Sequence, residues 1–161
     1  MSTHFYHRNL PMLLLRARET VIQYFRPQLK RRALTEQQWR VMRVLDTEGV
    51  VDASRLAEES CILPSSLTGV LDRMERDGLI RRSRIESDQR KVLIDLTEHS
   101  RAIVGDMQDL IELQYQLIAQ RMGQTDLLEL YRLLDKVAAL AAAPHADNVS
   151  GTGADAPAGQ V

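Results

Sequence analysis

The chain has 161 residues, of which 44% are hydrophobic and 27% charged, a globular rather than a disordered balance. This length accommodates one domain with a sizeable core and is too short for two ordinary domains. The single cysteine excludes an internal disulfide framework and a multi-cysteine zinc site. The N-terminus has no apolar run of signal-peptide length, and no later segment approaches a membrane span. We therefore expect a cytoplasmic protein without membrane contact.

The net charge of −1 conceals an uneven distribution of charge along the chain. Residues 1–91 hold 17 lysines and arginines against 12 acidic residues, whereas residues 92–161 hold 4 against 10. Neutralisation of phosphates acts contact by contact, so a local basic patch matters more than the charge of the whole chain. The first part of the chain is therefore suited to an anionic partner, although arginines that merely solvate helices are the commoner explanation of such runs.

The first long segment, residues 9–34, has the periodicity of an amphipathic helix. Pro11 suits the first turn of that helix, whereas Pro27 is awkward inside it. We therefore predict a kink or break near Tyr24 to Arg26. The apolar residues recur at steps of three and four: Leu10, Leu14, Ala17, Val21, Phe25 and Leu29.

Three helices are predicted next, and the last two form a candidate helix-turn-helix. The first opens with a Thr-x-x-Gln capping box at Thr35 and closes at Gly49. The second begins after its N-cap Asp52, and a tight turn around Cys61 joins it to the third. The third helix occupies residues 63–78, and its expected apolar face comprises Leu63, Leu67, Val70, Leu71 and Met74.

After Gly78 the hydrophobic period changes from that of a helix to that of a strand. Residues 79–85 and 91–96 are predicted to form two strands, and the polar residues 86–90 a turn between them. Three helices followed by a hairpin is the element order of a winged helix.

Two long apolar helices follow the hairpin. Thr97 is the expected cap of the first, which ends at Gly123, and Thr125 the expected cap of the second. Their apolar surface exceeds what one small monomer can cover, so we expect a second copy of the chain to cover it. Residues 144–161 are rich in Gly, Ala and Pro without periodicity, which predicts a disordered tail.

These elements predict a mainly α fold of the α+β class, a winged helix-turn-helix with a helical dimerisation domain. Residues 1–34 and 97–143 are the expected dimerisation region. Residues 35–96 are the expected DNA-binding region.

The sequence offers no constellation for catalysis, and we expect no enzyme, metal or cofactor. It contains no Gly-rich phosphate loop, HExxH or Gly-x-Ser-x-Gly motif. Three of the four histidines lie near the chain ends, so a zinc pair has little support. Cys61 has no histidine nearby in sequence; it is interpreted as a buried packing residue, with redox sensing left open.

The polar side of the helix at residues 63–78 suits the major groove of DNA. Small hydroxylic residues near its N-terminus allow close approach to bases or phosphates, and arginines further along suit phosphates. A capped surface helix with incidental polarity would explain the same residues if the helix stood alone. The candidates are Pro64, Ser65, Ser66, Thr68, Arg73 and Arg76.

The hairpin favours the DNA interpretation. Arg90 on a narrow projecting turn can enter the minor groove, and Asp88 can hold its guanidinium with a bidentate pair. The structural alternative is a surface salt bridge that steadies the hairpin. The candidates at this tip are Asp88, Gln89, Arg90 and Lys91.

The segment "DRMERDGLIRR", followed by "DQRK" and a strand ending in Leu-Thr, resembles the MarR family of winged-helix transcription regulators. The resemblance covers roughly residues 8–143. The blocks "FRPQLKRRALTEQQWRVMRVL" and "CILPSSLTGVLDRMERDGL" are similar to one branch, the repressors of homoprotocatechuate degradation operons. The resemblance implies a homodimer on a palindromic double-stranded DNA operator of an aromatic-acid catabolic operon, with repression relieved by a small phenolic carboxylic acid. A regulator of this family that senses redox state through Cys61 is the alternative.

The resemblance also implies an effector pocket between the dimerisation helices and the DNA-binding lobe. A carboxylate favours a planar bidentate donor, and a phenol ring favours an aromatic or aliphatic wall. Trp39 could equally be a core or interface residue. The ligand candidates are Arg16, Arg18, Trp39, Arg40, Arg43 and His7.

Overall fold

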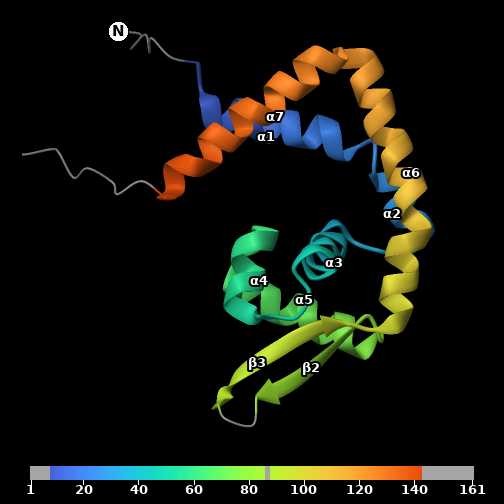
Figure 1. Cartoon of the computed structure of the whole chain (residues 1–161), viewed down its shortest axis with the longest axis vertical. Coiled ribbons are helices and arrows are strands. Elements are labelled where there is room, and N and C mark those ends of the chain that lie inside the picture. The colour runs from blue at the N-terminus through green and yellow to red at the C-terminus, as the bar shows by residue number, and fades with distance from the viewer. Residues whose placement is uncertain (1–7, 86–87, 143–161) are drawn as a thin grey trace, which may run out of the picture. The chain divides into compact units, whose positions relative to one another are not determined.

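The computed structural model describes residues 8–85 and 88–142 (Figure 1). The side chains of residues 85, 88–91 and 142 lie outside this description, as do His7 and the predicted tail. The chain divides into two compact units, with the boundary between Arg121 and Met122.

The first two helices confirm the break predicted from Pro27. Helix α1 spans Leu10–Ile22, and α2 spans Arg26–Arg31 after a turn at residues 23–25. Pro27 lies in the first turn of α2, where its missing N–H leaves no intrahelical bond unmade.

Helix α3 spans Glu36–Glu48 and has both bonds of the predicted capping box. The Gln38 N–H donates to Thr35 Oγ1 at 3.1 Å, and the Thr35 N–H donates to Gln38 Oε1 at 2.9 Å. Gly49 ends the helix with a φ of 77°. The capped helix buries Val41, Met42 and Leu45 completely.

Helices α4, Ala53–Ser60, and α5, Pro64–Arg76, form the helix-turn-helix. Asp52 caps α4 as predicted, accepting a bond from the Arg55 N–H at 2.9 Å. Two expectations were wrong. Cys61 is exposed rather than buried, because it occupies the left-handed position that ends α4. Leu63 is 72% exposed, because it precedes the first helical residue of α5 and does not share its apolar face.

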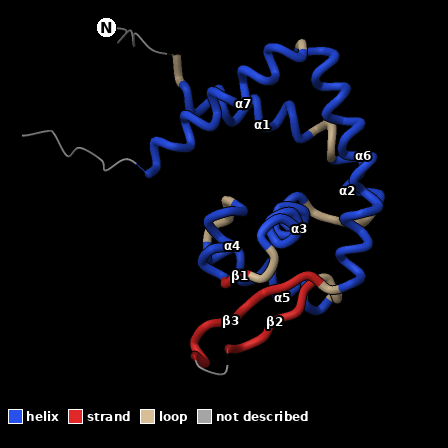
Figure 2. The backbone as a smooth tube through the Cα atoms, in the orientation of Figure 1, coloured by secondary structure: helices blue, strands red, loops and turns tan. Residues whose placement is uncertain are grey.

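A three-stranded antiparallel sheet lies beside these helices (Figure 2). Its order is β1-β3-β2, with β1 at Val51–Asp52, β2 at Ile80–Ile85 and β3 at Asp88–Leu96. The two-residue β1 is too short to carry a periodic signal and was not predicted.

The hairpin is longer than its sequence suggested. The backbone of residues 88–90 belongs to β3, so the prediction that they form the turn was wrong. The polar composition of these residues indicated a turn, but pairing with β2 continues as far as Ile85 opposite Asp88, beyond an irregularity at Arg84.

One hydrophobic core joins α2–α6 and the sheet. Its fully buried side chains include Leu56 on α4, Met74 on α5, Ile94 on β3 and Met107 on α6. This shared core fixes α5 and the root of the hairpin in one body.

Helix α6 spans Glu98–Met122, and α7 spans Gln124–Ala139, followed by a 3-10 turn at Leu140–Ala142. Thr97 caps α6 as predicted, accepting from the Ser100 N–H at 3.2 Å. Thr125 was wrongly predicted to cap α7: Gly123, with a φ of 97°, is the residue that precedes the helix. None of the described helices is both long enough and apolar enough to cross a bilayer.

Candidate functional site

Helix α5 brings the six predicted DNA-contact residues onto one exposed surface. All of Pro64, Ser65, Ser66, Thr68, Arg73 and Arg76 are exposed, whereas the opposite side of the helix is buried. Pro64 begins the helix, and Thr68 Oγ1 donates to its carbonyl at 3.4 Å. A Cβ built on Gly69 would lie 3.6 Å from Arg73 Nη1, so this guanidinium lies close over the glycine.

The hairpin is fixed to α5 by an arginine that was not among the candidates. Arg82 on β2 donates from Nη2 to Asp72 at 2.7 Å, and its Nε lies 3.6 Å from Glu75. Both carboxylates are on α5. The side chains of Asp88, Gln89, Arg90 and Lys91 lie outside the description, so their proposed contacts stay predictions.

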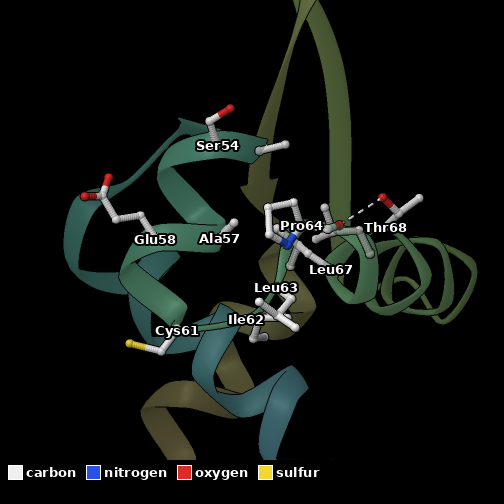
Figure 3. A pocket seen from close by; sticks show the side chains of 11 residues that line it. Ser54, Ala57, Glu58, Cys61, Ile62, Leu63, Pro64, Leu67 and Thr68 are labelled. Carbon is white, nitrogen blue, oxygen red and sulfur yellow. Dashed lines mark hydrogen bonds between the residues drawn. The ribbon is translucent and has the colours of Figure 1, made fainter.

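A cavity of about 680 Å³ lies between α4 and α5 (Figure 3). Leu63, Pro64 and Thr68 line it beside the exposed surface of α5. Glu58 is the charged residue of its described lining. Its described lining has no Lys, Arg or His side chain to pair with a carboxylate, so this cavity does not suit the effector that the sequence predicts.

A second cavity, of about 370 Å³, lies between α3 and α6 and has the matching chemistry. We name it the α3–α6 cavity. It brings together two sequence candidates, Trp39 and Arg43, with the Arg43 guanidinium carbon 6.0 Å from the centroid of the indole. The other lining residues are Asp46 on α3 and, on α6, Arg101, Val104, Gly105, Gln108, Ile111, Glu112 and Tyr115.

Sequence reasoning missed Arg101 and Tyr115, which line the same cavity. The Tyr115 ring also packs against Phe25, with ring centroids 5.0 Å apart and planes at 56°. Arg101 and Tyr115 lie on one face of α6, together with residues 105, 108 and 112, at alternating steps of four and three. That spacing was present in the sequence, but only the packing of α3 shows which face of α6 lines a cavity.

The remaining ligand candidates lie elsewhere. Arg16 is exposed on α1. Arg18 forms ion pairs with Glu19 at 2.8 Å and Glu36 at 3.0 Å. Arg40 donates from Nη1 to the carbonyls of Ser60 and Cys61, at 2.9 and 3.0 Å. It therefore provides hydrogen-bond donors to carbonyl groups at the C-terminal end of α4.

Asp95 connects the sheet to α6 beside this cavity. It is 8% exposed and accepts from Arg81 Nη2 at 2.6 Å and from Arg101 Nη2. Burial would raise the pKa of Asp95, but the bond from Arg81 and the positive charges of Arg101 and Arg81 outweigh it and hold the pKa below its ordinary value. Asp95 is therefore an ionised carboxylate at neutral pH.

Helices α3, α4 and α5 are followed by the β2–β3 hairpin, and α5, the second helix of the helix-turn-helix, has a polar exposed surface. This arrangement defines a winged-helix DNA-binding protein. The MarR family model matches residues 34–92. The homoprotocatechuate degradative operon repressor of Escherichia coli is 44% identical over 134 residues, which cover 83% of this chain and 90% of that protein. The chain therefore belongs to the MarR family of transcriptional regulators.

Solved structures agree with this assignment. Transcriptional regulator PA4135 has a TM-score of 0.80 and 42% identity, covering 82% of this chain and 97% of that one. NadR, solved in complex with 4-hydroxyphenylacetate, has a TM-score of 0.76 and 36% identity, covering 86% of this chain and 98% of that one. PA4135 is a transcriptional regulator, and the Escherichia coli relative is an operon repressor.

Proposed function

We propose that the protein is a homodimeric repressor of an aromatic-acid catabolic operon, released from a palindromic operator by a small phenolic acid. The observation that carries the effector class is the α3–α6 cavity, which joins an indole, a phenol and two guanidinium groups. The similarity to a homoprotocatechuate operon repressor and to NadR bound to 4-hydroxyphenylacetate supports the same class.

The cavity suits such a ligand in size and chemistry. A volume of about 370 Å³ lies at the lower end of the range of small-molecule pockets, which suits a single-ring acid. The Arg43 guanidinium can bind the carboxylate with two N–H donors, and Trp39 and Ile111 supply an apolar wall for the ring. Glu112 can accept a hydrogen bond from a phenolic hydroxyl.

On the DNA side, α5 would lie in the major groove and the hairpin tip in the neighbouring minor groove. The exposed residues of α5 named above support the first contact, whereas the roles of Asp88, Gln89, Arg90 and Lys91 rest on sequence. We assign dimerisation to residues 1–34 and 97–143, DNA binding to residues 35–96, and the site of action to the cytoplasm. The redox alternative has only the exposure of Cys61 in its favour, and we do not propose it.

The first prediction is that 4-hydroxyphenylacetate weakens operator binding by roughly 5- to 150-fold, the usual range of allosteric coupling. Arg43→Ala should keep operator affinity and lose at least tenfold in effector affinity, because the carboxylate loses a charge-assisted donor. Operator titration at fixed salt, with and without the acid, measures the first effect, and calorimetry the second.

Arg32→Ala is the matched control. Arg32 pairs with Asp106 on α6 at 3.2 Å but does not line the α3–α6 cavity, so its loss should leave effector binding unchanged. Flat calorimetric titrations of the wild-type protein with both 4-hydroxyphenylacetate and 3,4-dihydroxyphenylacetate would refute the effector class.

A further inference from the structure

Arg101 belongs to two places in the structure at once. Its side chain lines the α3–α6 cavity, and its Nη2 donates to the buried carboxylate of Asp95 on β3. Arg43, the other arginine of the cavity, pairs with Asp46 on its own helix, at 3.2 Å. Among the described residues of this cavity, Arg101 is thus the one with an ion pair to the sheet.

We propose that Arg101 binds the effector's carboxylate and that its bond to Asp95 transmits this binding to the DNA-contacting hairpin. This inference rests on the proposed function, because it names a second ligand residue of the same cavity and the route by which the ligand acts.

The chemistry of the guanidinium allows a ligand carboxylate to approach Arg101 while Asp95 is still bound to it. It carries five N–H donors in a planar fork, and Asp95 accepts from one end of it. The Arg101 side chain is 47% exposed, so further donors are open to a ligand. The carboxylate of a bound acid would then face two arginines, Arg43 from α3 and Arg101 from α6.

The position of Asp95 makes it a suitable relay. Its neighbours in β3, Ile94 and Leu96, are each 1% exposed and anchor the hairpin in the core. Asp95 pairs with Arg81 of β2 in the sheet register, and α6 begins three residues after it. The Asp95–Arg101 bond therefore joins the root of the hairpin to the first turn of α6.

A ligand carboxylate competes with Asp95 for the same cation. When Arg101 turns toward the ligand, the bond between β3 and α6 weakens, and the hairpin is held less firmly at its DNA-competent angle. Asp95 keeps its bond to Arg81 at 2.6 Å, so no buried carboxylate loses all of its partners. Because breaking the Asp95–Arg101 bond costs little, ligand binding can shift the equilibrium between the arrangement with this bond and the arrangement without it.

The test compares two arginines that share one carboxylate. Arg101→Gln removes the partner of Asp95 that lines the cavity, whereas Arg81→Gln removes the partner that does not. Each variant is titrated onto operator DNA at fixed salt, with and without saturating 4-hydroxyphenylacetate. The readout is the ratio of the two dissociation constants, together with effector affinity from calorimetry without DNA.

Arg101→Gln should bind the acid roughly tenfold more weakly, and even at saturation its ratio should fall close to one. Arg81→Gln should keep the wild-type ratio, whatever it does to operator affinity itself. Asp95→Asn separates binding from transmission: effector affinity should stay within about threefold of wild type while the ratio falls. Circular dichroism and thermal melting verify that each variant is folded.

The outcomes are distinguishable. Wild-type effector affinity in Arg101→Gln would overturn the binding role, and a wild-type ratio in both Asp95→Asn and saturated Arg101→Gln would overturn the transmission. An equal loss of the ratio in Arg81→Gln would show that the sheet, rather than the cavity, is responsible. A wild-type protein that neither acid binds or releases from DNA would instead contradict the proposed function itself.

Discussion

Glu36, the first residue of α3, holds three helices together through two arginines. Its carboxylate pairs with Arg18 of α1 at 3.0 Å and with Arg26 of α2 at 2.6 Å. Burial would raise the pKa of Glu36, but the bonds from Arg26 and Arg18 outweigh it and lower the pKa. The position in the first turn of a helix favours the same negative charge.

Glu36→Gln should lower the free energy of unfolding by about 1 kcal/mol at neutral pH, a modest effect because both arginines are 44% exposed. Because the folded-state pKa is depressed, the contribution is complete above the pKa of the unfolded chain and is lost as pH falls through the folded pKa. Urea unfolding of both proteins at neutral and acid pH measures it.

Salt provides the control for this prediction. In 1 M salt the difference between wild type and Glu36→Gln should shrink, since exposed charges are then screened within about 3 Å. A difference that is independent of both pH and salt would assign the effect to packing instead of charge.

Helices α2, α4 and α5 end in the same way, although only α5 has the expected glycine. Each is followed by a residue in the left-handed conformation. The next residue then donates a backbone hydrogen bond to a carbonyl five residues earlier: Leu34 to Leu29, Ile62 to Ala57 and Leu79 to Met74. The left-handed residues are Ala33, Cys61 and Gly78. Only glycine adopts that conformation without a steric cost.

Cys61→Gly should raise the free energy of unfolding by about 1 kcal/mol, because it removes the strain of a side chain at a φ of 50°. Cys61→Ser keeps that strain and is the matched control, expected to stay close to wild type. Thermal denaturation in a reducing buffer compares them; equal stability of the glycine and serine variants would contradict the idea.

These helix ends show what local sequence could predict. The capping box of α3, Pro27 and Gly78 carry their conformational preferences within a few residues, so the helix boundaries around them were predicted to within about two residues. Cys61 has no such preference, and its conformation is imposed by the hydrogen bonds of the helix end. Its exposure was therefore mispredicted.

The residues of the candidate site also differ in how far the sequence could predict them. The residues of α5 proposed to contact DNA are polar positions on an amphipathic helix, so periodicity alone predicts that they are exposed. The α3–α6 cavity depends on which faces of two helices distant in sequence meet, which periodicity does not specify. Trp39 and Arg43 were predicted by residue type, whereas Arg101 required the packed structure.

Exposed apolar side chains are concentrated outside the winged helix. Among described large apolar side chains that are exposed, Val50 and Leu63 lie between residues 35 and 96. The others belong to α1, α6, α7 and the turn after it, and they support the proposed homodimer. They are Leu10, Met12, Leu15, Val21, Leu113, Tyr115, Leu117, Met122, Leu128, Tyr131, Leu133, Leu134, Val137 and Leu140.

The corresponding prediction concerns α7. Leu134→Asp should shift the protein toward monomers at micromolar concentration, because it places a charge on the apolar stripe of Tyr131, Leu134 and Val137. Operator affinity should fall at least tenfold, since two half-sites then no longer bind as one linked unit. Sedimentation measures the oligomeric state and gel shift the affinity.

Lys136→Asp is the control, because it adds an acidic group on the opposite side of the same helix. It should leave the dimer intact. A Leu134→Asp variant that sediments as wild type would remove α7 from the proposed interface.

Arg82 of β2 joins the hairpin to α5. The shared core and the ion pairs of Arg82 with Asp72 and Glu75 hold the hairpin against α5, so the two parts proposed to contact DNA have little freedom to slide or turn independently. In the proposed complex, the spacing along the DNA between the bases that α5 contacts and the minor groove that the hairpin enters is therefore fixed. New target sites for such a regulator would arise by exchanging bases in place, whereas inserting a single base pair between the two contacts would leave one of them unmade.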